Sequence, residues 1–335
     1  MNEAPWFEDF IVGDDFSQVP SVTITEGYGV MHQAMFGDRL RLPLDHGLSK
    51  AVLMSDSAVV NPSLVCNLGI GQTTIPSQRV MGNLFYRGLI LRQPVFIGDT
   101  LATNTKVVAL RQNKLKPGRA ASGMVALEMH VTNQRDETIM LFWRCPMILC
   151  KDPDADTGHA DDFDMMPEAL KISDLEAAAT AYHCVAFREL VQGEHFAELS
   201  VGDHLVVEAR DTITMAPELV RLTLNMAMTH TDATRSVYGK RLVYGGHTIS
   251  MAAAQISRVM PNMMTILGWF KCDHVAPVFE QDILRTEITI EALHPLPSGG
   301  IAMLHIETFV TRGKEAPETG DNIKVLDWHL AALFA

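Results

Sequence analysis

The residues best suited to acid/base chemistry stand together in the segment Asn-Met-Ala-Met-Thr-His-Thr-Asp at positions 225–232. His230 is a candidate proton carrier, because an imidazole has the side-chain pKa nearest neutrality. Asn225 cannot titrate, so its amide can only orient water, a substrate or the imidazole. Asp232 could assist proton transfer, or it could cap the short helix that follows. The chain has 13 histidines, so a histidine chosen without further context would more often be structural than catalytic.

A second group that could do chemistry is the backbone at Gly245 and Gly246. Residues 245–260 are rich in Ala and Met, begin with this glycine pair and end just before Pro261, which predicts one long, mostly buried helix. The N–H groups of the pair could stabilise negative charge on a bound oxygen atom, because a helix N-terminus carries unpaired donors. Glycine also permits close backbone approach, although the pair alone is compatible with an ordinary tight turn. His247 begins the same helix and is a further candidate for contact with a substrate or a catalytic group.

A basic cluster interrupts the acidic background of the chain at positions 111–119, in a loop that joins two predicted strands. Guanidinium and ammonium groups can bind phosphates; the alternative is a solvated hairpin tip that happens to be basic. The candidates for phosphate binding in this loop are Arg111, Lys114, Lys116 and Arg119, and the preceding strand adds Arg87 and Arg92. The sequence has no GxGxxG motif, Walker-type loop or metal-ligand cluster, so it indicates neither a nucleotide cofactor nor a metal.

The chain contains an internal repeat, which indicates a duplicated fold. Phe-Glu-Asp-Phe-Ile-Val-Gly-Asp at 7–14 matches Phe-Ala-Glu-Leu-Ser-Val-Gly-Asp at 196–203, an offset of 189 positions. Pro-Val-Phe-Ile-Gly-Asp at 94–99 matches Pro-Val-Phe-Glu-Gln-Asp at 277–282, an offset of 183 positions. The first half has therefore gained six residues between the two matches.

Segments with alternating, β-branched residues follow each repeat and predict antiparallel strands. They span 100–110, 121–132 and 139–149 in the first half, and 283–293, 301–311 and 325–333 in the second. One apolar helix followed by several antiparallel strands, repeated twice, predicts an α+β architecture in which each sheet wraps a central helix. The acidic, aperiodic stretch 151–164 is typical of a linker, and a helical stretch follows at 167–181. We therefore expect an N-terminal domain at 1–150, an acidic linker and helix at 151–190, and a C-terminal domain at 191–335.

Composition and charge narrow the class of protein. With 335 residues, 47% of them hydrophobic and 20% charged, the chain is typical of a globular protein of two domains. The net charge of −13 repels phosphate backbones and anionic lipid, so neither a nucleic acid nor a membrane surface is an expected partner. The N-terminus does not look like a signal peptide, and the most apolar stretch, 138–150, is interrupted by Arg144 and has the length of a buried strand. Five cysteines without a CxxC pair predict neither a disulfide framework nor a zinc site, and reduced thiols in a cytoplasmic protein are the default.

Several segments resemble motifs of a known family. They are the Val-Gly-Asp entry strands, the Pro-Val-Phe-x-x-Asp strands and the turn Tyr-Gly-Lys-Arg-Leu-Val-Tyr-Gly-Gly-His at 238–247. Over nearly its whole length, the chain resembles the MaoC-like acyl-CoA dehydratases and hydratases, which are hot-dog folds that often occur as fused double domains. Asn-Leu-Phe-Tyr-Arg-Gly-Leu at 83–89, Thr-Asn-Gln-Arg-Asp-Glu-Thr at 132–138 and the segment 241–250 are most similar to the mesaconyl-CoA hydratase, or β-methylmalyl-CoA dehydratase, branch.

The resemblance implies a tandem double hot-dog fold and reversible hydration of an enoyl-CoA thioester. Active members carry the motif D-x-N-P-x-H ahead of the central helix, and the stretch from Asn225 to His230 keeps the histidine and its spacing but has an amide in place of the aspartate. At the offset of 189, Phe36 and Arg41 stand opposite these two residues. Only the C-terminal half is then expected to be catalytic.

The resemblance also implies roles for the other candidates. His230 would act as the base, Asn225 would orient it or the water, and the N–H groups of Gly245 or Gly246 would stabilise the thioester oxygen. The basic cluster would bind the phosphates of coenzyme A, and Tyr244 stands where the family commonly has a histidine. No cofactor is implied beyond the coenzyme A of the substrate, and further association into a homo-oligomer stays open.

Two other functions stay open at the level of sequence. A non-catalytic acyl-CoA binding protein would have kept the fold and lost the aspartate, as Asn225 suggests. An acyl-CoA thioesterase is the other, because hot-dog folds also host hydrolysis.

Overall fold

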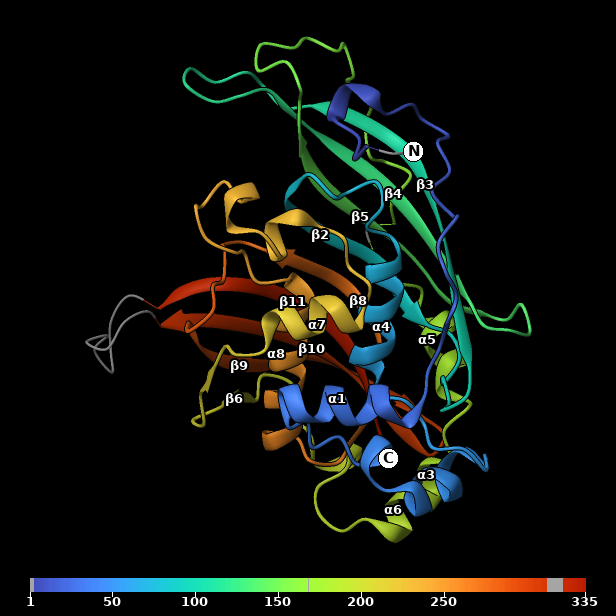
Figure 1. The fold of residues 1–335 in the computed structure, drawn as a ribbon. Helices are drawn as coiled ribbons and strands as arrows, with labels where there is room; N and C mark the ends of the chain where they lie inside the picture. The colour runs from blue at the N-terminus through green and yellow to red at the C-terminus, as the bar shows by residue number, and fades with distance from the viewer. Residues whose placement is uncertain (1–2, 168, 312–321) are drawn as a thin grey trace.

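One antiparallel sheet runs through both halves of the chain (Figure 1), in a computed structural model that describes residues 3–167, 169–311 and 322–335. Along the sheet the strands follow the order β1-β3-β4-β5-β2-β8-β11-β10-β9-β6, and β7 pairs with β9 off this path. The strands are β1 (Val22–Thr23), β2 (Val80–Leu91), β3 (Thr100–Gln112), β4 (Ser122–Thr132), β5 (Thr138–Leu149), β6 (His204–Val206), β7 (Asp211–Thr212), β8 (Met263–His274), β9 (Ile283–Leu296), β10 (Gly299–Thr311) and β11 (Ile323–Phe334). All six strands predicted from alternation are confirmed to within three residues at each end.

The helices lie on the sheet and at its end. They are α1 (Glu26–Phe36), α2 (Arg41–Leu44), α3 (His46–Leu53), α4 (Pro62–Gln72), α5 (Ile172–Ala179), α6 (Cys184–Leu190), α7 (Ala216–Leu222) and α8 (Gly245–Val259). Short 3-10 turns are η1 (Phe7–Asp9), η2 (Phe196–Glu198), η3 (Met228–His230) and η4 (Ala233–Arg235). In the described residues, no helix is long and apolar enough to cross a membrane.

Two buried helices, α4 and α8, are the central helices of the two halves and contact each other (Figure 1). The predicted helix at 245–260 is confirmed as α8, whose residues 246–257 are all buried. In α4, Asn61 caps the helix by accepting from the N–H of Ser63, Pro62 starts it, and every residue is buried. Between them, the Asn67 amide of α4 donates to the Ser250 hydroxyl of α8 at 2.8 Å. The α+β architecture with a central helix in each half is therefore confirmed.

The two halves share their sheet through the pairing of β2 with β8. This pairing is antiparallel and sets Tyr86 opposite Cys272 and Leu89 opposite Trp269. The large buried side chains of Tyr86, Trp269 and Trp328 meet edge to face around the junction. One hydrophobic core consequently contains residues from both halves.

The structure locates the change of repeat offset. The starts of α4 and α8, of β2 and β8, and of β3 and β9 all differ by 183 positions. The six additional residues of the first half therefore precede α4, in the region of α2 and α3, which the second half replaces by η3 and η4. Arg41 begins α2, and its Nε donates to the Pro261 carbonyl at 3.0 Å.

The segment between the halves is packed against them. Within the predicted linker 151–164, Asp161 accepts from the Leu110 N–H of β3, and Ala160 bridges to Arg111. Of the helical stretch predicted at 167–181, α5 covers Ile172–Ala179, and the sequence did not predict α6.

Candidate active site

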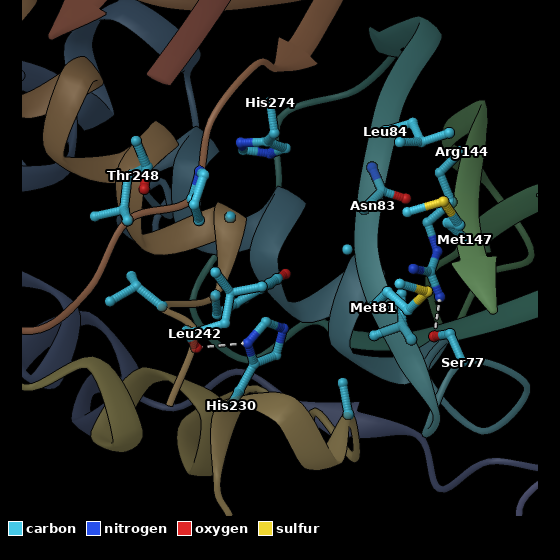
Figure 2. A pocket seen from close by; sticks show the side chains of 18 of the residues that line it. Ser77, Met81, Asn83, Leu84, Arg144, Met147, His230, Leu242, Thr248 and His274 are labelled. Atoms are coloured by element: carbon cyan, nitrogen blue, oxygen red, sulfur yellow. Dashed lines mark hydrogen bonds between the residues drawn. The ribbon is translucent and has the colours of Figure 1, made fainter. Parts of the chain in front are cut away.

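A cavity of about 210 Å³ opens where the two halves meet. The first half contributes residues from the end of α4, from β2 and from β5; the second contributes the segment 225–248 and the residues after β8 (Figure 2). Three of the predicted site residues line it, namely His230, Asn225 and Gly245. The predicted acid/base segment and the start of the central helix therefore meet at one site.

His230 lies at the end of η3 with its ring in the cavity (Figure 2). Its Nδ1 is 2.8 Å from the Leu242 carbonyl oxygen, and since a carbonyl can only accept, Nδ1 carries the proton and Nε2 keeps its lone pair. Burial lowers the pKa of His230 to about 4, and the nearby charge of Arg144 acts in the same direction. The imidazole is therefore neutral at pH 7 and fit to accept a proton.

Asn225 shapes the segment that carries His230. Its Oδ1 accepts from the Ala227 N–H at 2.9 Å. Two first-half residues hold the same segment, since the Thr74 hydroxyl accepts from the Met226 N–H and the Gln78 carbonyl accepts from the Met228 N–H. The position of His230 thus depends on both halves of the chain.

At the start of α8, the close approach of neighbouring side chains leaves no room for a side chain at Gly245 or Gly246. A Cβ at Gly245 would collide with the His274 imidazole, and a Cβ at Gly246 would collide with Asn67 Oδ1 and the Tyr244 ring. The N-cap residue Tyr244 makes no side-chain hydrogen bond to this helix start, and unpaired N–H groups in the first turn of a helix can donate to a ligand oxygen. Gly245 lines the cavity, whereas Gly246 faces α4.

Arg144 lines the cavity, and no role was predicted for it from the sequence. It lies on β5, its side chain is 3% exposed, and its Nη2 donates to the Thr73 carbonyl at 2.8 Å and to the Ser77 hydroxyl at 2.7 Å (Figure 2). Among the described residues, its buried Nε has no hydrogen-bond partner. Burial lowers the pKa of this guanidinium, but an arginine remains charged in proteins.

Further polar atoms in the cavity wall are buried without a partner in the described structure. They are the Tyr244 hydroxyl, Asn83 Oδ1 and His274 Nε2. The Tyr244 ring lies 5.6 Å from the His230 ring, and burial raises the pKa of Tyr244 well above its usual value. Tyr244 is therefore a protonated hydroxyl beside the candidate base, on the residue whose role the sequence left open.

Two assisting candidates lie outside the cavity lining. Asp232 is exposed and accepts from the Thr234 N–H and hydroxyl, so it caps η4. His247 is fully buried, its Nε2 is 2.9 Å from the Thr214 carbonyl, and its ring packs on Phe36. Both have a structural role in these positions.

The six basic candidates for phosphate binding also stand apart from the cavity lining. Arg87 pairs with Asp273 at 2.6 Å, and Arg92 pairs with Asp174 at 3.5 Å. Arg111 stacks on Phe163. The other three lie exposed in the turn between β3 and β4; they are Lys114, Lys116 and Arg119. Phosphate binding by these residues remains a prediction.

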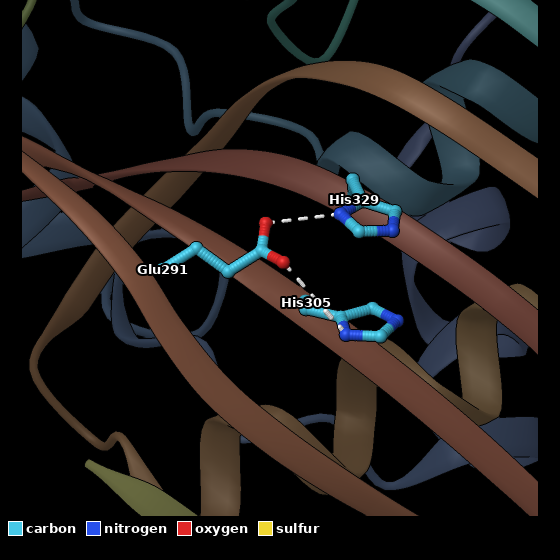
Figure 3. A group of neighbouring side chains, drawn as sticks. All are labelled: Glu291, His305 and His329. Carbon is cyan, nitrogen blue, oxygen red and sulfur yellow. Dashed lines mark hydrogen bonds and ion pairs between the residues drawn. The ribbon is translucent and has the colours of Figure 1, made fainter. Parts of the chain in front are cut away.

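A histidine and carboxylate cluster lies elsewhere, on strands β9, β10 and β11 (Figure 3). His305 and His329 are cross-strand partners with stacked rings 4.1 Å apart, and Glu291 reaches both of their Nδ1 atoms, at 3.8 and 3.0 Å. Asp327 faces their Nε2 atoms and pairs with Lys324 at 2.7 Å. The sequence did not indicate this cluster, because its members come from three strands with no common spacing.

Two central helices, each covered by one half of a continuous antiparallel sheet, define the chain as a tandem double hot-dog protein. Its structure superimposes with a TM-score of 0.90 on a conserved hypothetical protein of Mycobacterium tuberculosis with a double hot-dog fold, at 39% identity over 99% of both chains. It superimposes with a TM-score of 0.86 on a MaoC-domain protein of Chloroflexus aurantiacus, at 26% identity over 100% of this chain and 98% of that one.

Comparison with characterised sequences gives the family. The chain is 27% identical to the β-methylmalyl-CoA dehydratase of Chloroflexus aurantiacus, over 93% of this chain and 90% of that protein. It is 26% identical to the mesaconyl-CoA hydratase of Cereibacter sphaeroides, over 94% of both. No protein-family profile matches the chain. The chain belongs to the MaoC-like family of double hot-dog dehydratases and hydratases, as its motifs predicted.

Proposed function

We propose that this protein catalyses the reversible hydration of an enoyl-CoA thioester to a 3-hydroxyacyl-CoA at the cavity between its two halves. The observation that carries the proposal is the His230 imidazole, which is held in one tautomer by the Leu242 carbonyl and is neutral in a largely apolar cavity. Mesaconyl-CoA and β-methylmalyl-CoA are the first substrate pair to test, because two relatives are named for them.

The reaction needs a base for water, a donor for the thioester oxygen and a proton for Cα. His230 Nε2 would take a proton from water as the water oxygen bonds to Cβ. The electron pair of the C=C bond moves toward the thioester oxygen, where the N–H groups at the start of α8 would stabilise the enolate. The imidazolium then returns its proton to Cα, which leaves the base neutral and water added across the double bond. These steps use no cofactor.

Asn225 would act by position rather than by proton transfer. Its amide holds the segment before His230 through the Ala227 N–H, which is a task that needs an acceptor and no ionisable group. The absence of an aspartate at this position is therefore compatible with catalysis by His230.

The test is the loss of enoyl-thioester absorbance when the purified chain is mixed with mesaconyl-CoA. We expect His230→Ala to lower kcat/KM by roughly 100- to 10,000-fold, the usual contribution of a general base. Arg41→Ala is the matched control, because Arg41 bonds to Pro261 away from the cavity, and it should keep the rate within about threefold.

Two outcomes would replace the proposal. Tight binding of acyl-CoA by calorimetry without turnover would make the protein a binding protein. Release of free thiol from the thioester would make it a thioesterase.

A further inference from the structure

Arg144 is a buried cation without a carboxylate partner in the described part of the chain. Its side chain is 3% exposed, and its recorded acceptors are one carbonyl and one hydroxyl. Other partly buried arginines do have such a partner: Arg258 pairs with Asp211, and Arg285 with Glu287. An unpaired buried charge is costly, so arginines in this position are normally neutralised.

The arrangement around Arg144 leaves donors directed to a ligand. Thr73 and Ser77 accept from Nη2, and the buried Nε has no partner within the part of the chain that the structure describes. The same side chain lines the cavity beside Met81 and Met147, opposite His230 (Figure 2). Both methionines are apolar and keep the surroundings of the guanidinium poor in competing acceptors.

We propose that Arg144 is the residue that binds the free carboxylate of a dicarboxylic acyl-CoA, and that it thereby sets the preference for such a substrate over a thioester without a second carboxylate. The inference rests on the proposed function, since it assigns the far end of the acyl group whose thioester lies near α8. A carboxylate supplies the acceptor that the guanidinium lacks, and charge-assisted hydrogen bonds of this kind are among the strongest in proteins. The Thr73 and Ser77 contacts fix the guanidinium in advance, which reduces the entropy lost on binding.

The alternative role for Arg144 is to stabilise the enolate oxygen, and the two roles differ in their substrate dependence. An arginine that binds a carboxylate affects only substrates that carry one. An arginine at the enolate affects every enoyl thioester, because all of them form the enolate.

The experiment compares mesaconyl-CoA with the analogous thioester in which a methyl group replaces the free carboxylate. For the unmodified protein, we expect kcat/KM to be at least about 100-fold higher with the dicarboxylic thioester. Arg144→Gln should lower kcat/KM for mesaconyl-CoA by roughly 100-fold or more and change the value for the methyl analogue by less than about fivefold. Equal losses for both thioesters, or no initial preference, would overturn the inference.

Two further measurements keep folding and function apart. Arg285→Gln removes a partly buried arginine that has its own carboxylate and should leave the substrate preference unchanged; Arg144→Met, which fills the same space without charge, should behave as Arg144→Gln does. If the unmodified protein does not hydrate either thioester, calorimetry decides: selective binding of mesaconyl-CoA that is lost in Arg144→Gln supports the carboxylate site while the hydratase proposal fails. No selectivity in binding rejects the site itself.

Discussion

At the scale of single residues, the cavity is distinguished by polar atoms that the described protein leaves unpaired. Arg144 Nε, the Tyr244 hydroxyl and Asn83 Oδ1 are all buried without a partner. Such atoms are uncommon in folded proteins, because each costs the free energy of its lost hydration. Their concentration beside a neutral histidine indicates a site that is completed by a bound molecule.

Tyr244→Phe should separate a functional hydroxyl from a structural one. Removing an unsatisfied buried hydroxyl leaves the free energy of unfolding unchanged or raises it slightly. If the hydroxyl donates to the substrate, kcat should fall by about 10- to 100-fold. Steady-state kinetics and urea unfolding of the same preparations measure both quantities.

Tyr182→Phe provides the matched control with the opposite result. Tyr182 is partly buried outside the cavity lining, and its side chain shares a hydrogen bond with Thr265. This substitution should lower the free energy of unfolding by about 1 kcal/mol and leave kcat unchanged. A Tyr244→Phe variant with full activity would show that the hydroxyl takes no part in the reaction.

At the scale of elements, the strands and helices that follow from a local residue pattern were predicted correctly from the sequence. Alternation gave six strands, and the Ala- and Met-rich run gave α8 with its boundary at Pro261. The role of Arg144 could not be predicted in this way. In the sequence, Arg144 stands out only as a charged residue that interrupts an apolar strand. Its neighbours in the cavity, Thr73 and Ser77, are brought next to it when β2 pairs with β5 and β8. Pairing between distant segments leaves no trace in local spacing.

The same limit explains the outcome at Asp232. Its sequence context fitted both a cap and a catalytic partner, and only the position of its carboxylate, on Thr234 and at the surface, favours the cap. For His247, the Thr214 carbonyl that its ring contacts lies 33 positions away. Neither contact follows from motif spacing.

Gly246→Ala should destabilise the contact between the central helices. A methyl group there would collide with Asn67 Oδ1, and the hydrogen bond from Asn67 to Ser250 would be lost with the close approach. We expect a loss of about 2–3 kcal/mol in the free energy of unfolding, measured by urea denaturation.

Gly29→Ala in α1 is the control for the change of residue type. A Cβ at Gly29 meets nothing within 4 Å, so alanine should be neutral or stabilise the helix by up to about 1 kcal/mol. If both variants unfolded at the same urea concentration, the close approach at Gly246 would not contribute to stability.

At the scale of the whole molecule, the two halves act as one unit. The sheet is continuous across β2 and β8, and the cavity takes Arg144 and Asn83 from one half and His230 and Gly245 from the other. The N-terminal half, which has no counterpart of His230, therefore supplies one wall of the cavity. The two halves of the duplicated fold thus contribute different side chains to the cavity.

The free energy of unfolding should depend on pH because of histidines at the junction between the two halves. Three histidines are buried at or near it and a fourth, His274, is partly buried. Desolvation is the main cause that lowers the pKa of His32, His230, His247 and His274 from 6.5 to about 4 in each case. In the unfolded chain these groups bind protons below pH 6.5, whereas in the folded protein they stay neutral until about pH 4. Their contribution to stability is therefore complete above pH 6.5 and is lost as the pH falls toward 4.

We expect the urea midpoint to decrease between about pH 7 and about pH 4.5, with a loss on the order of 3 kcal/mol or less for each buried histidine. His247→Gln removes one of the four groups, so the slope of unfolding free energy against pH should become shallower by close to one proton. His46→Asn changes an exposed histidine and should leave the slope unchanged. Equal slopes in all three proteins would mean that His247 binds its proton as readily in the folded state as in the unfolded state, which would contradict the prediction.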